Sequence, residues 1–152
     1  MSLKINGLAP HFISKDQDNK PIQLSDFLGK KLVLYFYPKD NTPGCTTQAC
    51  NLRDNYNALL KAGYEIVGVS TDSVDSHKRF IEKAQLPFRL IADEDRTVHM
   101  QYGTWIEKSM FGKKYWGTAR ITFVIDETSK LIKIIDRVKT ADHTAQILET
   151  AS

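Results

Sequence analysis

The sequence predicts an α/β fold in which a mixed central sheet is covered by helices on both faces. Three observations indicate it: short continuous apolar runs, amphipathic segments between them, and the order in which the two kinds of segment alternate. Continuous apolar runs are typical of strands that are buried on both faces. Because a strand–helix–strand connection forces its two strands to be parallel, the alternation favours a parallel core within the sheet.

The N-terminal quarter is expected to supply the first strands. The segments "HFIS" (11–14) and "IQLS" (22–25) flank the turn-rich "KDQDNKP" and predict a short hairpin or two edge strands. The run "KLVLYFY" (31–37) then predicts a strand buried on both faces, which Pro38 ends.

Helices are expected to alternate with the next two strands. Apolar residues at helical spacing, with Gly63 as the stop, predict one helix; they are Ala49, Leu52, Tyr56, Leu59 and Leu60. The segment "EIVGVST" (65–71) predicts a second buried strand. An amphipathic helix over Val74–Gln85 and a third strand, "FRLIA" (88–92), follow it.

The C-terminal half completes the predicted order. Acidic residues 93–95 are placed in the first turn of a short helix that ends at Tyr102, where they suit the helix dipole. A glycine- and aromatic-rich loop (103–117) follows, then a hairpin of "RITFVID" (120–126) and "LIKIIDRV" (131–138), and a last helix over about Ala141–Thr150. This order is that of the thioredoxin fold with an added N-terminal hairpin. We expect one domain over residues 1–152.

Composition excludes two classes of partner. The 21 basic and 18 acidic residues are spread along the chain, and the longest basic runs are pairs, so nucleic-acid binding is not indicated. No apolar run approaches the roughly 20 residues that span a bilayer, and the start lacks the features of a secretory signal. We therefore expect no membrane partner, a cytoplasmic location, and a disulfide between the two cysteines that is transient rather than structural.

Both cysteines lie in "TPGCTTQAC" (42–50), directly after the first buried strand. Thr42 fits as the helix N-cap, Pro43 as the first helical residue and Cys45 as the third. Unpaired N–H groups and the helix dipole stabilise a thiolate over a thiol at that position. Gly44 leaves the backbone open to a small substrate. Capping geometry suggests that the Thr42 hydroxyl lies near the Cys45 sulfur.

The second thiol is on another face of the same helix. Cys45 is on the apolar side, whereas Cys50 falls on a polar side with Arg53 and Asn57. A five-residue helical step separates Cα atoms by roughly 8–9 Å, beyond the limit of about 7 Å for a disulfide. A bond between the two sulfurs therefore requires the first turn to unwind, which fits a catalytic cycle better than a structural staple.

Several alternatives stay open on the residues alone. Cys45 could be a small core residue. A zinc site is disfavoured by the cysteine spacing and by four scattered histidines, and no histidine has a local context that pairs it with Cys45 for a hydrolase. General disulfide exchange normally uses C-x-x-C. The aromatic residues of the 103–117 loop could pack or form an apolar substrate rim. A peroxide-responsive redox sensor or chaperone-like binding module would use the same cysteine pair.

The segment "FYPKDNTPGCTTQAC" resembles the peroxiredoxins, specifically the bacterioferritin comigratory protein group, also called peroxiredoxin Q. The resemblance extends from "LAPHF" through "LSDFLGK", "GVSTDS", "LIADED" and "YGTW" to "RITFVID". It implies that Cys45 is the peroxidatic cysteine and Cys50 the resolving one. It also implies that Thr42 hydrogen-bonds the peroxide, that Pro38 and Pro43 shape the pocket, and that Arg120 is the active-site arginine.

The same resemblance implies the activity. A protein of this group reduces hydrogen peroxide and organic hydroperoxides through a sulfenic acid at Cys45. Cys50 then closes an intramolecular disulfide, which thioredoxin or a similar dithiol reductant reopens. No metal, haem or flavin is required. Scattered charge and the lack of a large exposed edge motif favour a monomer.

Overall fold

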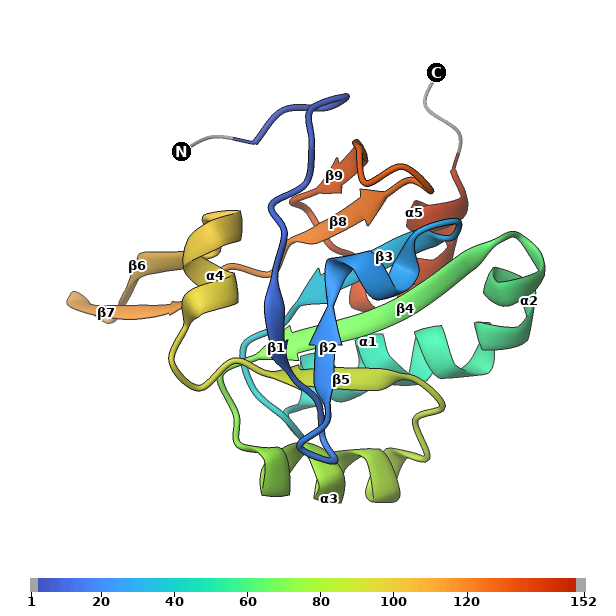
Figure 1. Cartoon of the computed structure of the whole chain (residues 1–152). Helices are drawn as coiled ribbons and strands as arrows, with labels where there is room; N and C mark the ends of the chain where they lie inside the picture. The colour runs from blue at the N-terminus through green and yellow to red at the C-terminus, as the bar shows by residue number, and fades with distance from the viewer. Residues whose placement is uncertain (1–2, 150–152) are drawn as a thin grey trace.

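A five-stranded sheet of order β5–β4–β3–β8–β9 forms the centre of the computed structural model, which describes residues 3–149 (Figure 1). The strands are β3 (Lys31–Phe36), β4 (Tyr64–Ser70), β5 (Arg89–Ala92), β8 (Thr122–Ile125) and β9 (Leu131–Ile135). β3, β4 and β5 are parallel, whereas β8 runs antiparallel to β3 and β9 antiparallel to β8. The predicted mixed sheet with a closing hairpin is confirmed.

Helices cover both faces of the sheet, as predicted. Alternate residues of β3 point to opposite sides, so Leu34 and Phe36 join one apolar cluster and Val33 and Tyr35 the other. Val33 and Tyr35 share their cluster with residues of α1 (Pro43–Asp54), α2 (Tyr56–Lys61), α3 (Val74–Ala84) and α5 (His143–Leu148). The opposite cluster includes residues of β2 (Pro21–Gln23), the 3-10 helix η1 (Leu24–Phe27) and α4 (Thr97–Tyr102). β2 pairs with β1 (Ile13–Lys15) in the expected N-terminal hairpin.

The helix predicted to run from the Thr42 cap to Gly63 is two helices. Asn55 separates α1 from α2, with backbone φ −111° and ψ 12°. Its side-chain amide donates to the Asn51 carbonyl at 2.8 Å. A side chain that bonds a carbonyl one turn back competes with the backbone hydrogen bond and interrupts the helix. The apolar spacing continues across this break, so the pattern could not reveal it.

The prediction of a loop over 103–117 is wrong, because most of this segment is an antiparallel hairpin of β6 (Trp105–Met110) and β7 (Lys113–Thr118). Figure 1 shows it extending from one side of the molecule, beside α4. Phe111 and Gly112 form the turn with φ of 52° and 77°, as a two-residue hairpin turn requires. Most of its side chains are exposed, so the sequence lacks the alternation that marks a half-buried strand.

The helix starting near the acidic residues 93–95 begins later than predicted. Arg96 is the N-cap, with φ 64°, and α4 starts at Thr97. The carboxylate of Asp93 still accepts hydrogen bonds from the N–H groups of Val98 (3.1 Å) and His99 (2.8 Å), so acid stabilises the helix start from outside it.

The C-terminal helix α5 follows a short 3-10 helix, η2 (Thr140–Asp142). Thr150, the predicted end of the last helix, lies outside the described residues. Within the described range, no helix is both long and apolar enough to cross a membrane.

Gly68 in β4 is a position where the packing admits no side chain. An added Cβ would lie 2.7 Å from Leu90 Cδ2 and 2.8 Å from Tyr35 Cζ. Overpacking of this kind destabilises a core by about 1–3 kcal/mol, so we expect Gly68→Ala to lower the free energy of unfolding by that amount in urea denaturation. Gly117→Ala is the control, because its Cβ would come no closer than 3.4 Å to a neighbour. Equal stability of the two variants would contradict the packing argument.

Candidate active site

The first turn of α1 is held at the end of the central strand. Beyond β3, the Tyr37 N–H continues the pairing by donating to the Val69 carbonyl at 3.0 Å, and the half-buried Pro38 ends the strand. A loop through Thr42 leads to Pro43, which is exposed and is the first residue of α1. The order of strand, loop and helix is as the sequence predicts.

Thr42 is the N-cap residue, but its side chain does not cap the helix. Its hydroxyl donates to the Lys39 carbonyl at 2.8 Å. The expected capping hydrogen bond is therefore absent. The first α-helical bond joins the Thr46 N–H to the Thr42 carbonyl at 2.8 Å. In the described part of the chain, the N–H groups of Gly44 and Cys45 have no acceptor.

Cys45 lies on the buried side of α1, with only 1% of its surface exposed. Arg120, which follows β7 in the chain, donates from Nη2 to the Cys45 sulfur at 3.2 Å. The guanidinium also donates from Nη1 to Gln48 Oε1 at 2.5 Å. A fixed guanidinium beside a buried sulfur stabilises the thiolate and orients it.

Gly44 lies next to this guanidinium. A Cβ at that position would lie 3.4 Å from Arg120 Nη2, an ordinary van der Waals distance, so the packing alone does not require glycine there. The open backbone that the sequence suggests for Gly44 stays a prediction.

Gln48 and Lys108 also belong to the surroundings of Cys45, and neither was among the candidate residues from the sequence. Gln48 is fully buried, and its position three residues after Cys45, on the same helix face, is the signal that could have found it. Lys108 on β6 has a lowered pKa because of partial burial and the nearby charge of Arg120, while Cys45 acts in the opposite direction. The hairpin thus brings a second cation towards the site.

Cys50 is half-buried, and like Cys45 it is a free thiol. It opens onto a shallow pocket of about 380 Å³ lined by Thr46, Thr47, Cys50, Asn51, Asp54 and Ala141. α1 is continuous across both cysteines. The structure therefore places the two thiols on one intact helix, with the buried sulfur contacted by Arg120 and the other near the surface.

A cluster of Asp40, Asp72 and His77 is the one group in the described residues whose ligand atoms lie close enough for a metal ion, within 4.8 Å of one another. These atoms already have protein partners. Asp40 Oδ2 faces His77 Nδ1 at 2.7 Å, and Asp72 Oδ2 accepts from the Asp40 N–H at 2.8 Å. The donors around the carboxylates fit a hydrogen-bonded network better than a cation.

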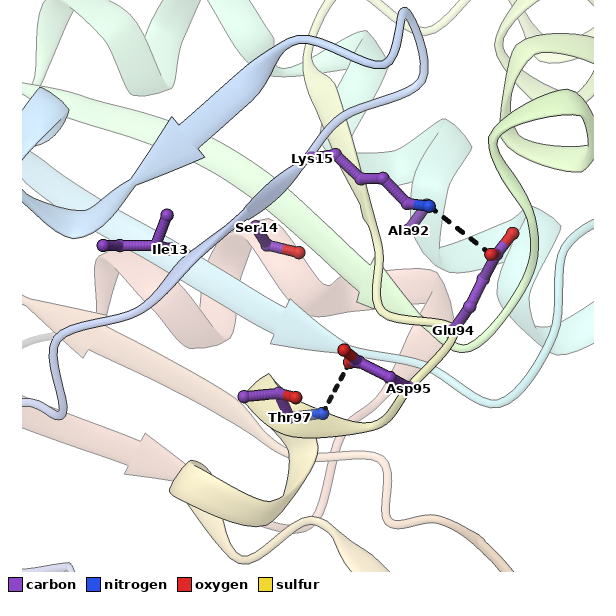
Figure 2. A pocket seen from close by; sticks show the side chains of 7 residues that line it. All are labelled: Ile13, Ser14, Lys15, Ala92, Glu94, Asp95 and Thr97. Atoms are coloured by element: carbon purple, nitrogen blue, oxygen red, sulfur yellow. Dashed lines mark hydrogen bonds and ion pairs between the residues drawn. The ribbon is translucent and has the colours of Figure 1, made fainter.

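A pocket of about 460 Å³ lies away from the cysteines, between β1 and the β5–α4 connection (Figure 2). Its charged groups are engaged with each other or with the backbone: Lys15 pairs with Glu94 at 3.4 Å, and Asp95 accepts from the Thr97 N–H at 3.0 Å. Neither cysteine lines this pocket.

Comparisons with known proteins identify the family of this chain. A sequence model described as the AhpC/TSA family matches residues 5–134. Peroxiredoxin Bcp of Escherichia coli K12 is 48% identical over 141 residues, which cover 93% of this chain and 90% of that protein. The structure of PrxQ from Xylella fastidiosa has a TM-score of 0.91 at 30% identity, covering 97% of this chain and 94% of that one.

A second similar structure is that of the Xanthomonas campestris bacterioferritin comigratory protein, from a study of its alkyl peroxide reduction activity. It has a TM-score of 0.85 at 33% identity and covers 96% of this chain and 93% of that one. The match thus spans nearly the whole chain in sequence and in fold. This chain belongs to the AhpC/TSA family, in its Bcp (peroxiredoxin Q) group of thiol-dependent peroxidases.

Proposed function

We propose that Cys45 is the peroxidatic residue of this peroxidase and that Cys50 resolves it through an intramolecular disulfide. The observation that carries the proposal is the hydrogen bond from Arg120 to a buried sulfur at the start of α1. A cation and unpaired amides around one sulfur favour its anionic, nucleophilic form. The substrates are hydrogen peroxide and organic hydroperoxides, in line with the alkyl peroxide reduction named for the Xanthomonas relative.

In the first step the Cys45 thiolate attacks one oxygen of the peroxide. A sulfur–oxygen bond forms, the oxygen–oxygen bond breaks, and the second oxygen leaves as water or an alcohol once it is protonated. Negative charge moves from sulfur to the leaving oxygen. Arg120 and the N–H groups of Gly44 and Cys45 are placed to stabilise that charge as it moves.

The residues around the sulfur receive distinct roles in this proposal. The Thr42 hydroxyl donates its hydrogen to the Lys39 carbonyl. The hydroxyl oxygen can therefore accept a hydrogen bond from the O–H of a bound peroxide. Pro38 and Pro43 bracket the loop and give the entrance its shape. Gly44, next to the guanidinium, leaves the backbone uncovered for a small substrate.

The second step joins Cys50 to the sulfenic acid, and a dithiol reductant of the thioredoxin type then attacks the disulfide. The half-exposed position of Cys50 supports access by such a partner. We expect the enzyme to act as a monomer made of one domain over residues 1–152, in the cytoplasm. Peroxide-dependent loss of both thiols, with mass mapping of a Cys45–Cys50 bridge, tests the pair directly.

Cys50→Ser should separate the two steps. The variant is expected to consume one equivalent of peroxide at the wild-type rate and then to stall with thioredoxin, because no disulfide can form. Dimedone should label Cys45 in the stalled enzyme. Sustained turnover with thioredoxin, at more than about a tenth of the wild-type rate, would show that Cys50 is not the resolving thiol.

A further inference from the structure

We propose that hydrogen-bonded anchors at Asp40 and Asn51 confine the rearrangement of α1 to residues 41–49, so that Cys45 travels to a Cys50 that stays in place. Asp40 and Asn51 thereby act as positioning residues for the resolving step. The inference rests on the proposed function, since it assumes a bridge between the two cysteines.

The resolving step requires the helix to open. Five helical residues separate Cα atoms by roughly 8–9 Å, whereas a disulfide allows about 7 Å, and α1 is intact over both cysteines. In the step, the Cys50 sulfur bonds to the Cys45 sulfur and the S–O bond of the sulfenic acid breaks. The oxygen leaves as water with the thiol proton. The sulfenic acid is reduced as the thiol is oxidised, so no further oxidant is needed.

The first anchor is the side chain and amide of Asp40. Its backbone N–H donates to Asp72 Oδ2 at 2.8 Å. Its carboxylate accepts from the Tyr37 hydroxyl at 2.6 Å and from the Ser76 hydroxyl at 2.8 Å. It also faces His77 Nδ1 at 2.7 Å, and its side chain is only 4% exposed. These contacts tie the residue before the rearranging segment to α3 and to the end of β4.

His77 makes this anchor difficult to open. Its Nε2 lies 2.8 Å from the Ile91 carbonyl, which can only accept, and its Nδ1 faces the Asp40 carboxylate. The fully buried ring therefore links Asp40 to β5. Breaking these hydrogen bonds without water to replace them leaves buried polar groups unsatisfied, which costs about 1–3 kcal/mol for each group. The chain is thus fixed at Asp40.

The second anchor is Asn51, the residue directly after Cys50. Its amide donates from Nδ2 to the Ala141 carbonyl at 3.1 Å, and its Oδ1 accepts from the Thr144 N–H at 2.8 Å. Thr144 is buried, and so is Leu52, the next residue of α1. The helix is therefore locked to the C-terminal segment from Asn51 onward, and Cys50 is held beside that lock.

Between the anchors few hydrogen bonds join the helix to the rest of the chain, although Cys45, Gln48 and Ala49 are buried. Among the described residues, the hydrogen bonds that tie 41–50 to distant parts of the chain all come from Arg120, to Cys45 and Gln48. Gln48 Nε2 is buried without a partner, and no side chain caps the helix at Thr42. An unpaired buried amide and an uncapped helix end both lower the free energy needed to unwind this turn.

Residue-resolved amide hydrogen exchange on the full chain tests the proposal, before and after one equivalent of hydrogen peroxide, with mass mapping of the bridge in the same sample. Exchange of the amides of Thr46–Cys50 should rise by at least about tenfold, while α5 and Leu59 of α2, whose N–H groups bond to carbonyls outside the unwound segment, should change by less than about twofold. A bridged protein in which α2 and α5 exchange as fast as Thr46–Cys50 overturns the inference alone. Absence of the bridge overturns the proposed function as well.

Asn51→Ala provides the kinetic test. Losing the anchor lets the opening spread and lowers the effective concentration of Cys50, so disulfide formation should slow by about tenfold. Sulfenic acid formation should stay within about twofold of wild type. Cys45 should then reach sulfinic acid at lower peroxide. Asn57→Ala, an exposed asparagine on α2, is the matched control and should change neither rate. A wild-type rate of disulfide formation in Asn51→Ala contradicts the assigned role of Asn51.

Discussion

Replacing Cys45 by serine is expected to abolish peroxide consumption, with a loss of at least about 10⁴-fold in the single-turnover rate. A serine hydroxyl is almost fully protonated at neutral pH, and no general base among the described residues hydrogen-bonds this position. The guanidinium of Arg120 stabilises an anion but cannot remove the proton from an alcohol. Rapid-mixing measurement of peroxide loss, with enzyme in excess over peroxide, checks this.

The matched control is Cys50→Ser, which makes the same chemical change five residues away. It should retain the first turnover, so the comparison separates loss of the nucleophile from any general effect of losing a thiol. If Cys45→Ser reduced peroxide as fast as Cys50→Ser, the nucleophile would lie elsewhere and the roles of Arg120 and Gln48 would lose their basis.

Much of the fold followed from local pattern. The apolar runs at 31–37 and 65–71 predicted the strands β3 and β4 because strands buried on both faces must be apolar throughout. The hairpin of β6 and β7 was missed for the opposite reason. Most of its side chains are exposed, so its sequence lacks the apolar alternation of a half-buried strand. Its turn also depends on positive φ at Phe111, a residue that rarely adopts it.

The residues of the candidate site likewise divide into those that a local pattern predicts and those that only the folded chain brings together. Cys45 and Cys50 could be predicted because helix capping is local: the Thr-Pro-Gly that precedes Cys45 fixes where the helix begins. Arg120 is 75 residues from Cys45 in the chain and reaches it only through the folded β7–β8 connection. No local pattern distinguishes this arginine from the others, so family resemblance was needed to select it. The anchor at Asp40 likewise depends on His77, 37 residues away.

Arg120→Met should lower the rate of reaction with hydrogen peroxide by about 10- to 150-fold. The substitution keeps much of the side-chain volume but removes the donors to the Cys45 sulfur and to Gln48. Hydrogen bonds to a charged group contribute about 1.5–3 kcal/mol. The rate of thiol alkylation at neutral pH should fall in parallel, because the guanidinium no longer contacts the reacting sulfur. Arg137→Met, at an exposed arginine two residues after β9, is the control and should leave both rates unchanged.

Comparison with Arg120→Lys and Gln48→Ala distinguishes the effect of the positive charge of Arg120 from the effect of its hydrogen-bond geometry. Lysine keeps the charge but cannot direct separate N–H groups at both partners, so Arg120→Lys should recover only part of the rate. If Gln48 acts only by holding the guanidinium, adding Gln48→Ala to Arg120→Met should cause no further loss, although Gln48→Ala alone slows the enzyme. Fully additive losses would mean that Gln48 contributes independently of Arg120, and the hydrogen bond that joins them would then not be the route of its effect.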